Sequence, residues 1–139
     1  MYNRYLITGA TGFLGRTVVE KLVRRNVRVD ALVLHNDPYA ALLPGEVHAV
    51  VGDVCEDASL EQFFADADDK TCVIHCAGII SVASRSGSKL YQVNIGGTCK
   101  VVRQCLEHHI GKMIYVSSVH AIPEKPKNCV ITEDCEFSP

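Results

Sequence analysis

Residues 6–15 read LITGATGFLG and carry three glycines between two stretches of different periodicity. The stretch that leads into them, residues 4–8, is short and apolar, which is typical of a buried strand that runs into a turn. From Phe13 onward the apolar residues recur with a helical period, and charged residues occupy the opposite face. This stretch therefore predicts a strand, a glycine turn and a helix in immediate succession.

The rest of the chain alternates in the same way. Strands are predicted at residues 27–34, 47–51, 72–76 and 112–116, and helices near Pro38 and at residues 59–65 and 89–108. The strand segments are almost continuous in valine, isoleucine and leucine, as in a parallel sheet that is covered on both faces. Right-handed crossovers then predict an α/β, Rossmann-type, doubly wound parallel sheet of order 3-2-1-4-5 in three α/β/α layers. We expect this domain to span residues 1–122 and the polar, proline-containing residues 123–139 to form a loop.

Each of the three glycines has a physical use in such a turn. Gly9 permits the tight turn, Gly12 leaves room for a pyrophosphate to reach backbone N–H groups, and Gly15 lets the helix lie close to the sheet. Because the required strand precedes the glycines and the required helix follows them, the pattern predicts a dinucleotide site. A turn that binds no ligand is the alternative.

Residues 8–15, TGATGFLG, resemble the TGxxGxxG signature of the extended short-chain dehydrogenase/reductase family, which includes sugar-nucleotide epimerases, dehydratases and dihydroflavonol-type reductases. Further matches follow in chain order and extend the resemblance over the whole chain. Gly52-Asp53-Val54 resembles the family's adenine-contacting motif, and HCAG at residues 75–78 resembles the end of its fourth strand. Asn94 matches a helix asparagine, and YVSS at residues 115–118 ends in the serine of the family's catalytic site.

The resemblance implies that Ser118 is catalytic. The implied cofactor-binding residues are Thr8, Gly9, Thr11, Gly12, Phe13, Leu14, Gly15, His35, Asp53, Val54, Cys76, Ala77, Gly78, Asn94 and Ser117. Simpler roles compete with some of these assignments, because Asp53 can cap a turn and Asn94 can bond backbone in the core. His75 can be a satisfied strand-end histidine, and Ser117 and Ser118 can start a loop.

The choice between NAD and NADP depends on the residue about 20 positions beyond the glycines, where NAD-binding folds place an acid. His35 stands there, and we expect Asp37 to cap the short helix that Pro38 begins. Arg16 can approach a 2′-phosphate or remain a solvated helix residue. Since no well-placed carboxylate would repel a phosphate, the sequence favours NADP over NAD.

Chemistry in this family requires a tyrosine with a lysine four residues later, and none of the five tyrosines has that partner. Residues 131–139, ITEDCEFSP, resemble the loop that precedes this motif in the family. The resemblance thus implies a longer parent, an NAD(P)-dependent oxidoreductase, epimerase or dehydratase that moves hydride between nicotinamide and a hydroxyl or carbonyl carbon of a small molecule. We expect the 139-residue chain alone to bind cofactor without turnover. A standalone dinucleotide sensor and a truncated, non-catalytic remnant are the alternatives.

Charge and composition argue against several other classes of protein. The net charge of −2 argues against nucleic acid, and no apolar run approaches the ~20 residues of a membrane span. The amino terminus lacks the pattern of a secretory signal, so we expect a cytoplasmic protein. Seven scattered cysteines predict reduced thiols, and no His/Cys set has the spacing of a metal site. An exposed fifth strand would favour homo-oligomers through the sheet edge, which a strict monomer in light scattering would contradict.

Overall fold

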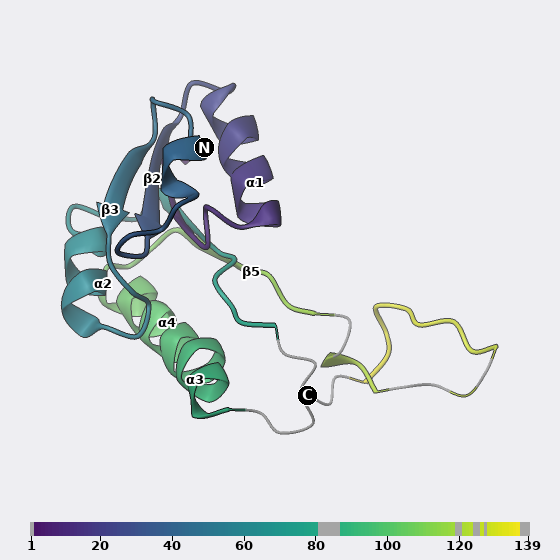
Figure 1. Ribbon diagram of the computed structural model, residues 1–139. Helices are drawn as coiled ribbons and strands as arrows, with labels where there is room; N and C mark the ends of the chain where they lie inside the picture. The colour runs from purple at the N-terminus through teal and green to yellow at the C-terminus, as the bar shows by residue number, and fades with distance from the viewer. Residues whose placement is uncertain (1, 81–86, 119–120, 124–125, 127, 137–139) are drawn as a thin grey trace.

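The computed structural model describes residues 2–80, 87–118, 121–123, 126 and 128–136. Its centre is a five-stranded parallel sheet of order β3-β2-β1-β4-β5 (Figure 1). The strands are β1 (Arg4–Thr8), β2 (Arg28–Val33), β3 (His48–Val51), β4 (Thr71–His75) and β5 (Lys112–Tyr115). The predicted fold class and strand order are confirmed, and each predicted strand is present with ends that differ by at most one residue.

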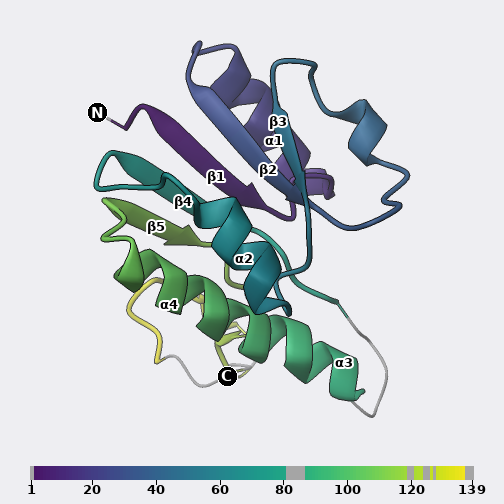
Figure 2. The same cartoon turned by 90° about the vertical axis from the view of Figure 1, so that its left-hand side faces the viewer.

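The helices follow the expected alternation but differ in detail. They are α1 (Phe13–Val23), the 3₁₀-helix η1 (Ala40–Leu42), α2 (Asp57–Phe64), α3 (Ser88–Tyr91), the π-helical segment η2 (Gln92–Gly97) and α4 (Thr98–Glu107). The single helix predicted over residues 89–108 therefore contains a π-helical stretch, which includes the adjacent glycines Gly96 and Gly97. Figure 2 shows α1 on one face of the sheet and α2 and α4 on the other. The three-layer arrangement is confirmed.

Neighbouring residues of one strand serve the two opposite cores, as the period of two in a strand requires. Leu6 of β1 packs with Phe63 and Phe64 of α2 and with Val101 of α4. Ile7, the next residue, belongs to the core on the other face, which also contains Val19 and Leu22 of α1 and Val29, Ala31 and Val33 of β2. The sheet is consequently covered on both faces, and its open edge at the carboxyl ends of the strands is left for a site.

A buried ion cluster lies within the sheet, and the sequence analysis did not anticipate it. Asp30 of β2 is fully buried and accepts hydrogen bonds from Arg4 Nε at 2.6 Å and Arg28 Nε at 3.2 Å, and it pairs with His48 Nδ1 at 2.7 Å. Arg4 also donates to the carbonyl oxygen of Ala65 at 3.0 Å. Burial raises the pKa of the Asp30 carboxyl, but Arg4, His48 and Arg28 together hold it below its ordinary value. The cluster joins β1, β2 and β3 through one carboxylate.

Strand β5 forms the edge of the sheet in the part of the chain that the structure describes, and Ile114 and Tyr115 are exposed on it. Association of two copies through this edge stays a prediction. The described residues from 121 to 136 contain no α-helix or strand, and residues 124, 125, 127 and 137–139 of the predicted loop lie outside the described residues. Within the described chain, no helix combines the length and the apolar character needed to cross a bilayer.

Candidate functional site

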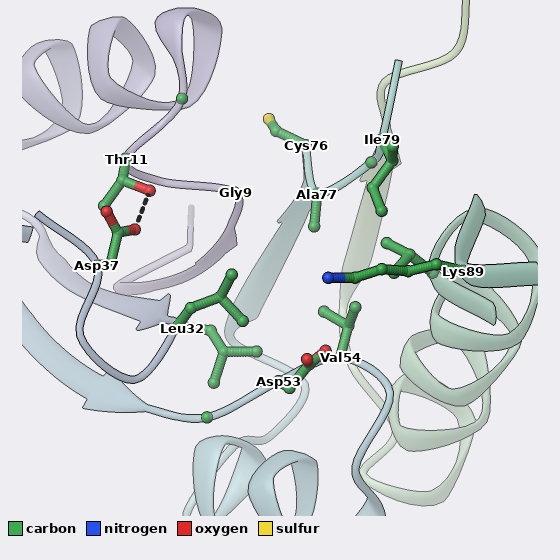
Figure 3. A pocket seen from close by; sticks show the side chains of 15 residues that line it. Gly9, Thr11, Leu32, Asp37, Asp53, Val54, Cys76, Ala77, Ile79 and Lys89 are labelled. Atoms are coloured by element: carbon green, nitrogen blue, oxygen red, sulfur yellow. Dashed lines mark hydrogen bonds between the residues drawn. The ribbon is translucent and has the colours of Figure 1, made fainter. Parts of the chain in front are cut away.

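A pocket of about 410 Å³ lies at the carboxyl ends of the central strands (Figure 3). Parallel α/β sheets bind ligands at this edge, where the connections on either side of β1 separate. Of the residues expected to bind cofactor, those that line the pocket are Gly9, Thr11, Gly12, Asp53, Val54, Cys76, Ala77 and Gly78. Lining residues that the sequence analysis did not assign to the site are Leu32, Leu34, Asp37, Gly52, Ile79, Lys89 and Val93.

Two of the three glycines are required by the protein itself. Gly9 has a φ of +67°, and a Cβ there would lie 2.6 Å from the backbone nitrogen of Ala77. A Cβ on Gly15 would overlap the carbonyl oxygen of Gly9. The helix α1 thus packs closely on the glycine turn through Gly15, whereas we expected this glycine to bring the helix close to the sheet.

Gly12 differs from both, because a Cβ there would require only a small shift of the neighbouring backbone. A Cβ at this position would approach only the carbonyl oxygen of Gly9, at 3.3 Å. The residue has a φ of −71°, which any amino acid adopts, and it lines the pocket as the residue that precedes α1. No side chain caps the first turn of α1, so its N–H groups have the arrangement that binds a phosphate. The geometry therefore fits the pyrophosphate of a dinucleotide.

Asp37 also lines the pocket, beside the glycine turn. Its carboxylate accepts hydrogen bonds from Thr11 Oγ1 at 2.7 Å and from the backbone nitrogen of Tyr39 at 2.9 Å, and Figure 3 shows the first of these. The expected cap of a helix that Pro38 begins is not observed, because η1 begins at Ala40 and has no side-chain cap. The Asp37 carboxylate instead closes the turn before η1 and lines the pocket. The premise that no carboxylate is well placed is therefore wrong, and the preference for NADP loses its basis.

His35, expected at the position that selects the cofactor, lies outside this pocket. It lines an adjoining hollow of about 360 Å³ together with Val51, Glu56 and Ser59. Arg16 does not line either hollow. The residues that line the main pocket near this point are Leu34 and Asp37, on either side of a turn at Asn36, whose φ is +58°.

Asp53 and Val54 form another wall of the pocket. The Asp53 carboxylate accepts the backbone N–H of Cys55 at 2.9 Å, so the turn-capping role is real and coexists with its place in the site. Val54 is buried against Gly97 of the π-helical segment, where a Cβ would lie 2.7 Å from Val54 Cγ2. The glycine at 97 therefore allows the helix to lie against this wall.

Thr8 and His75 form a buried network beneath the pocket. Thr8 has no exposed surface; its hydroxyl lies 2.6 Å from His75 Nδ1 and accepts the N–H of Ala77 at 3.3 Å. His75 Nε2 lies 2.9 Å from Thr98 Oγ1, and the ring stacks on Tyr115 at a centroid distance of 5.7 Å. Burial lowers the pKa of His75 to about 4. His75 is therefore the satisfied, neutral histidine of the simpler alternative. Thr8, which we expected to bind the cofactor, does not line the pocket.

Asn94 fixes the backbone that follows β4. Its Oδ1 accepts the N–H of Ile79 at 2.7 Å, and its Nδ2 donates to the carbonyl oxygen of the same residue at 2.9 Å. The backbone-binding alternative is therefore observed, and Asn94 acts on the pocket by positioning Ile79 in its wall.

The remaining predicted site residues lie at the margin of the site. Phe13 and Leu14 are exposed and do not line the pocket, since they begin the helix on its outer side. Ser117 and Ser118 follow β5 at the same edge of the sheet without lining the pocket, and the Ser118 carbonyl accepts the N–H of Ala121 at 3.0 Å. Their roles stay predictions. Residues 81–86, part of the loop after β4, lie outside the described residues.

Known proteins with similar sequences and structures indicate the family to which this chain belongs. The human 3 beta-hydroxysteroid dehydrogenase type 7 is 33% identical over 130 residues, which cover 88% of this chain and 34% of that protein. The Schizosaccharomyces pombe sterol-4-alpha-carboxylate 3-dehydrogenase erg26, decarboxylating, is 27% identical over 86% of this chain and 35% of its own length. The chain thus spans about a third of the curated relatives that it matches.

Among solved structures, UDP-glucose 4-epimerase of Thermus thermophilus, in complex with NAD, superimposes with a TM-score of 0.86 at 25% identity. The match covers 98% of this chain and 44% of that structure. Residues 6–137 match the 3-beta hydroxysteroid dehydrogenase/isomerase family over almost the whole sequence. Together with the glycine turn, the sheet order and the pocket, this match shows that the chain belongs to the 3-beta hydroxysteroid dehydrogenase/isomerase family, within the extended short-chain dehydrogenases/reductases.

Proposed function

We propose that this chain is the NAD-binding part of a dehydrogenase that acts on a hydroxyl group of a small molecule. The observation that carries the proposal is Gly12, a glycine on which a Cβ would require only a small backbone shift and which lines the pocket beside the first turn of α1. Bound nicotinamide supplies hydride transfer. The chain's own residues supply the binding: Gly12 and the first turn of α1 would hold the pyrophosphate, and Asp53 with Val54 would flank the adenine.

Asp37 supports NAD as the cofactor. A carboxylate at the end of the second strand hydrogen-bonds the ribose 2′-hydroxyl of NAD and repels the 2′-phosphate of NADP. Asp37 is prearranged by two hydrogen bonds from the protein, so little conformational freedom would be lost when a ribose binds.

We expect Asp37→Ala to lower the preference for NAD over NADP by about tenfold, because the repulsion of the 2′-phosphate is removed together with the ribose contact. The measurement is the dissociation constant of each dinucleotide by calorimetry. Glu61→Gln removes an exposed acid of α2 that does not line the pocket, and it serves as the control. An unchanged ratio for Asp37→Ala would exclude Asp37 as the residue that selects the cofactor.

The names of the relatives support a hydroxysteroid or sterol as the substrate class. The human relative is a hydroxysteroid dehydrogenase, and the fission-yeast relative is a 3-dehydrogenase of a sterol carboxylate. In the intact protein we expect NAD and a 3β-hydroxysterol to give NADH. UDP-glucose is the alternative substrate to be tested separately. The chain's contribution to that step would be Ser118, for which the family resemblance implies a role in orienting the reacting oxygen.

Ser118→Ala is expected to lower NADH formation by about 100-fold, as for loss of one oriented hydrogen-bond donor, and to leave NAD affinity unchanged. Ser59→Ala, in α2, is the matched control. Tight NAD binding without turnover on any of these alcohols would favour the sensor alternative over the enzyme.

A further inference from the structure

Lys89 is a lining residue that no motif of the sequence pointed to. It belongs to α3, and Figure 3 shows its side chain extending from that helix into the pocket, on the side away from Gly9 and Thr11. Lys89 as a whole is exposed, and its amino group ends in the space between the labelled lining residues.

The charges around the pocket make this position unusual. Among the described residues that line it, Asp37 and Asp53 are acidic and Lys89 is the one cation. Both carboxylates accept hydrogen bonds from the protein, from Thr11 and Tyr39 in one case and from Cys55 in the other. The Lys89 amino group, by contrast, makes no hydrogen bond or ion pair with any described residue.

A dinucleotide brings a doubly charged pyrophosphate into this space. The glycine turn and the first turn of α1 offer it only the partial charges of N–H groups, while two carboxylates oppose it. A full positive charge within reach of the same volume offsets that repulsion, and a lysine acts on phosphate as a mobile point charge.

We infer that Lys89 determines specificity for ligands that carry a pyrophosphate. Its amino group binds the pyrophosphate of the dinucleotide from the wall opposite the glycine turn. The inference rests on the proposed function, since it requires a dinucleotide in the pocket. It assigns to α3 a part in cofactor recognition that is separate from the glycine motif. The simpler alternative is a solvated helix lysine whose stem only covers apolar surface.

The test compares Lys89→Ala, Lys89→Arg and Lys70→Ala in the intact protein, with NAD, ADP and adenosine as ligands. Lys70 immediately precedes β4 and so lies at the opposite end of that strand from the pocket, which makes it the matched control. We expect Lys89→Ala to weaken NAD and ADP by about three- to tenfold and adenosine not at all, because adenosine carries no phosphate. Lys89→Arg should retain most of the affinity, and the loss in Lys89→Ala should shrink at high salt.

If Lys89→Ala weakens adenosine and ADP equally, the inference is overturned, and Lys89 only forms part of the pocket wall. If Lys89→Ala leaves the affinity for ADP unchanged, the inference is also overturned, and Lys89 is a solvated lysine. Both results leave NAD binding by the unmodified protein intact and so leave the proposed function standing. Failure of the unmodified protein to bind either NAD or ADP would instead overturn the proposed function, and the role of Lys89 with it.

Discussion

Gly12→Val is expected to weaken NAD binding by at least about 100-fold, or about 2.7 kcal/mol, while the protein remains folded. The new side chain would occupy the pocket beside the first turn of α1, where the pyrophosphate must approach the backbone. Its Cβ would meet only the Gly9 carbonyl oxygen, at 3.3 Å, and the backbone of Gly12 is already extended. The cost in stability should therefore be about 1 kcal/mol, the loss of a good residue before a helix.

The measurement is titration calorimetry with NAD, paired with thermal unfolding of the same samples. Gly45→Val is the matched control, because no atom lies within 4 Å of a Cβ at Gly45 and the residue does not line the pocket. Gly9→Val should behave in the opposite way and unfold the protein, since its φ is +67° and a Cβ would lie 2.6 Å from the Ala77 nitrogen. If Gly12→Val binds NAD with native affinity, the pyrophosphate does not lie against this glycine.

Asp30→Ala is expected to destabilise the protein by about 3 kcal/mol, because Arg4, which is itself buried, would lose the carboxylate that neutralises it. Urea unfolding measures the change. Asp57→Ala is the control: Asp57 also contacts two cations, Lys100 and Arg103, but at the surface, where solvent screens the pairs and little change is expected. Equal losses of unfolding free energy in the two variants would show that the buried cluster stabilises the protein no more than the surface ion pairs do.

The same cluster predicts a pH dependence. The pKa of Asp30 is lower in the folded protein than the value of about 3.9 in an unfolded chain, so its contribution to stability is complete above that value and is lost as the pH falls through the folded pKa. His75 acts in a higher window, between its folded pKa of about 4 and about 6.5, where the unfolded chain binds the proton that the buried ring refuses. Asp30→Ala should therefore remove only the lower part of the acid-induced loss of stability.

The fold could be predicted because periodicity reports burial directly. The apolar strands, the helical period from Phe13 and the glycine turn fix a parallel sheet, and handedness then fixes its order. The interruption at Gln92–Gly97 could not be found in this way, since a π-helical turn adds one residue without changing the composition of the helix. Two adjacent glycines, Gly96 and Gly97, were the available signal.

The candidate site was predictable where a backbone requirement selects the residue type, and less so where a side chain reaches in from elsewhere. Gly9 and Gly15 have such requirements, because a Cβ at either position would overlap backbone atoms. Asp37 was assigned only a capping role because counting positions from the glycines ended at His35, and the left-handed turn at Asn36 shifts that count. Lys89 resembles any exposed helix lysine in sequence, and Asp30 resembles an interruption of an apolar strand, because neither pattern shows which side chains will surround it.

The π-helical segment has a consequence for how this protein can change. An α-helix rotates about 100° per residue, so one extra residue within a turn reorients everything beyond it. Lys89 of α3 lines the pocket, Val93 of η2 lines the pocket and also packs against the core, and Val101 and Cys105 of α4 lie within that core. The helix therefore passes from pocket wall to core inside η2. A substitution at Val93 would alter ligand recognition and core packing together, whereas a substitution at Lys89 would leave the core packing unchanged.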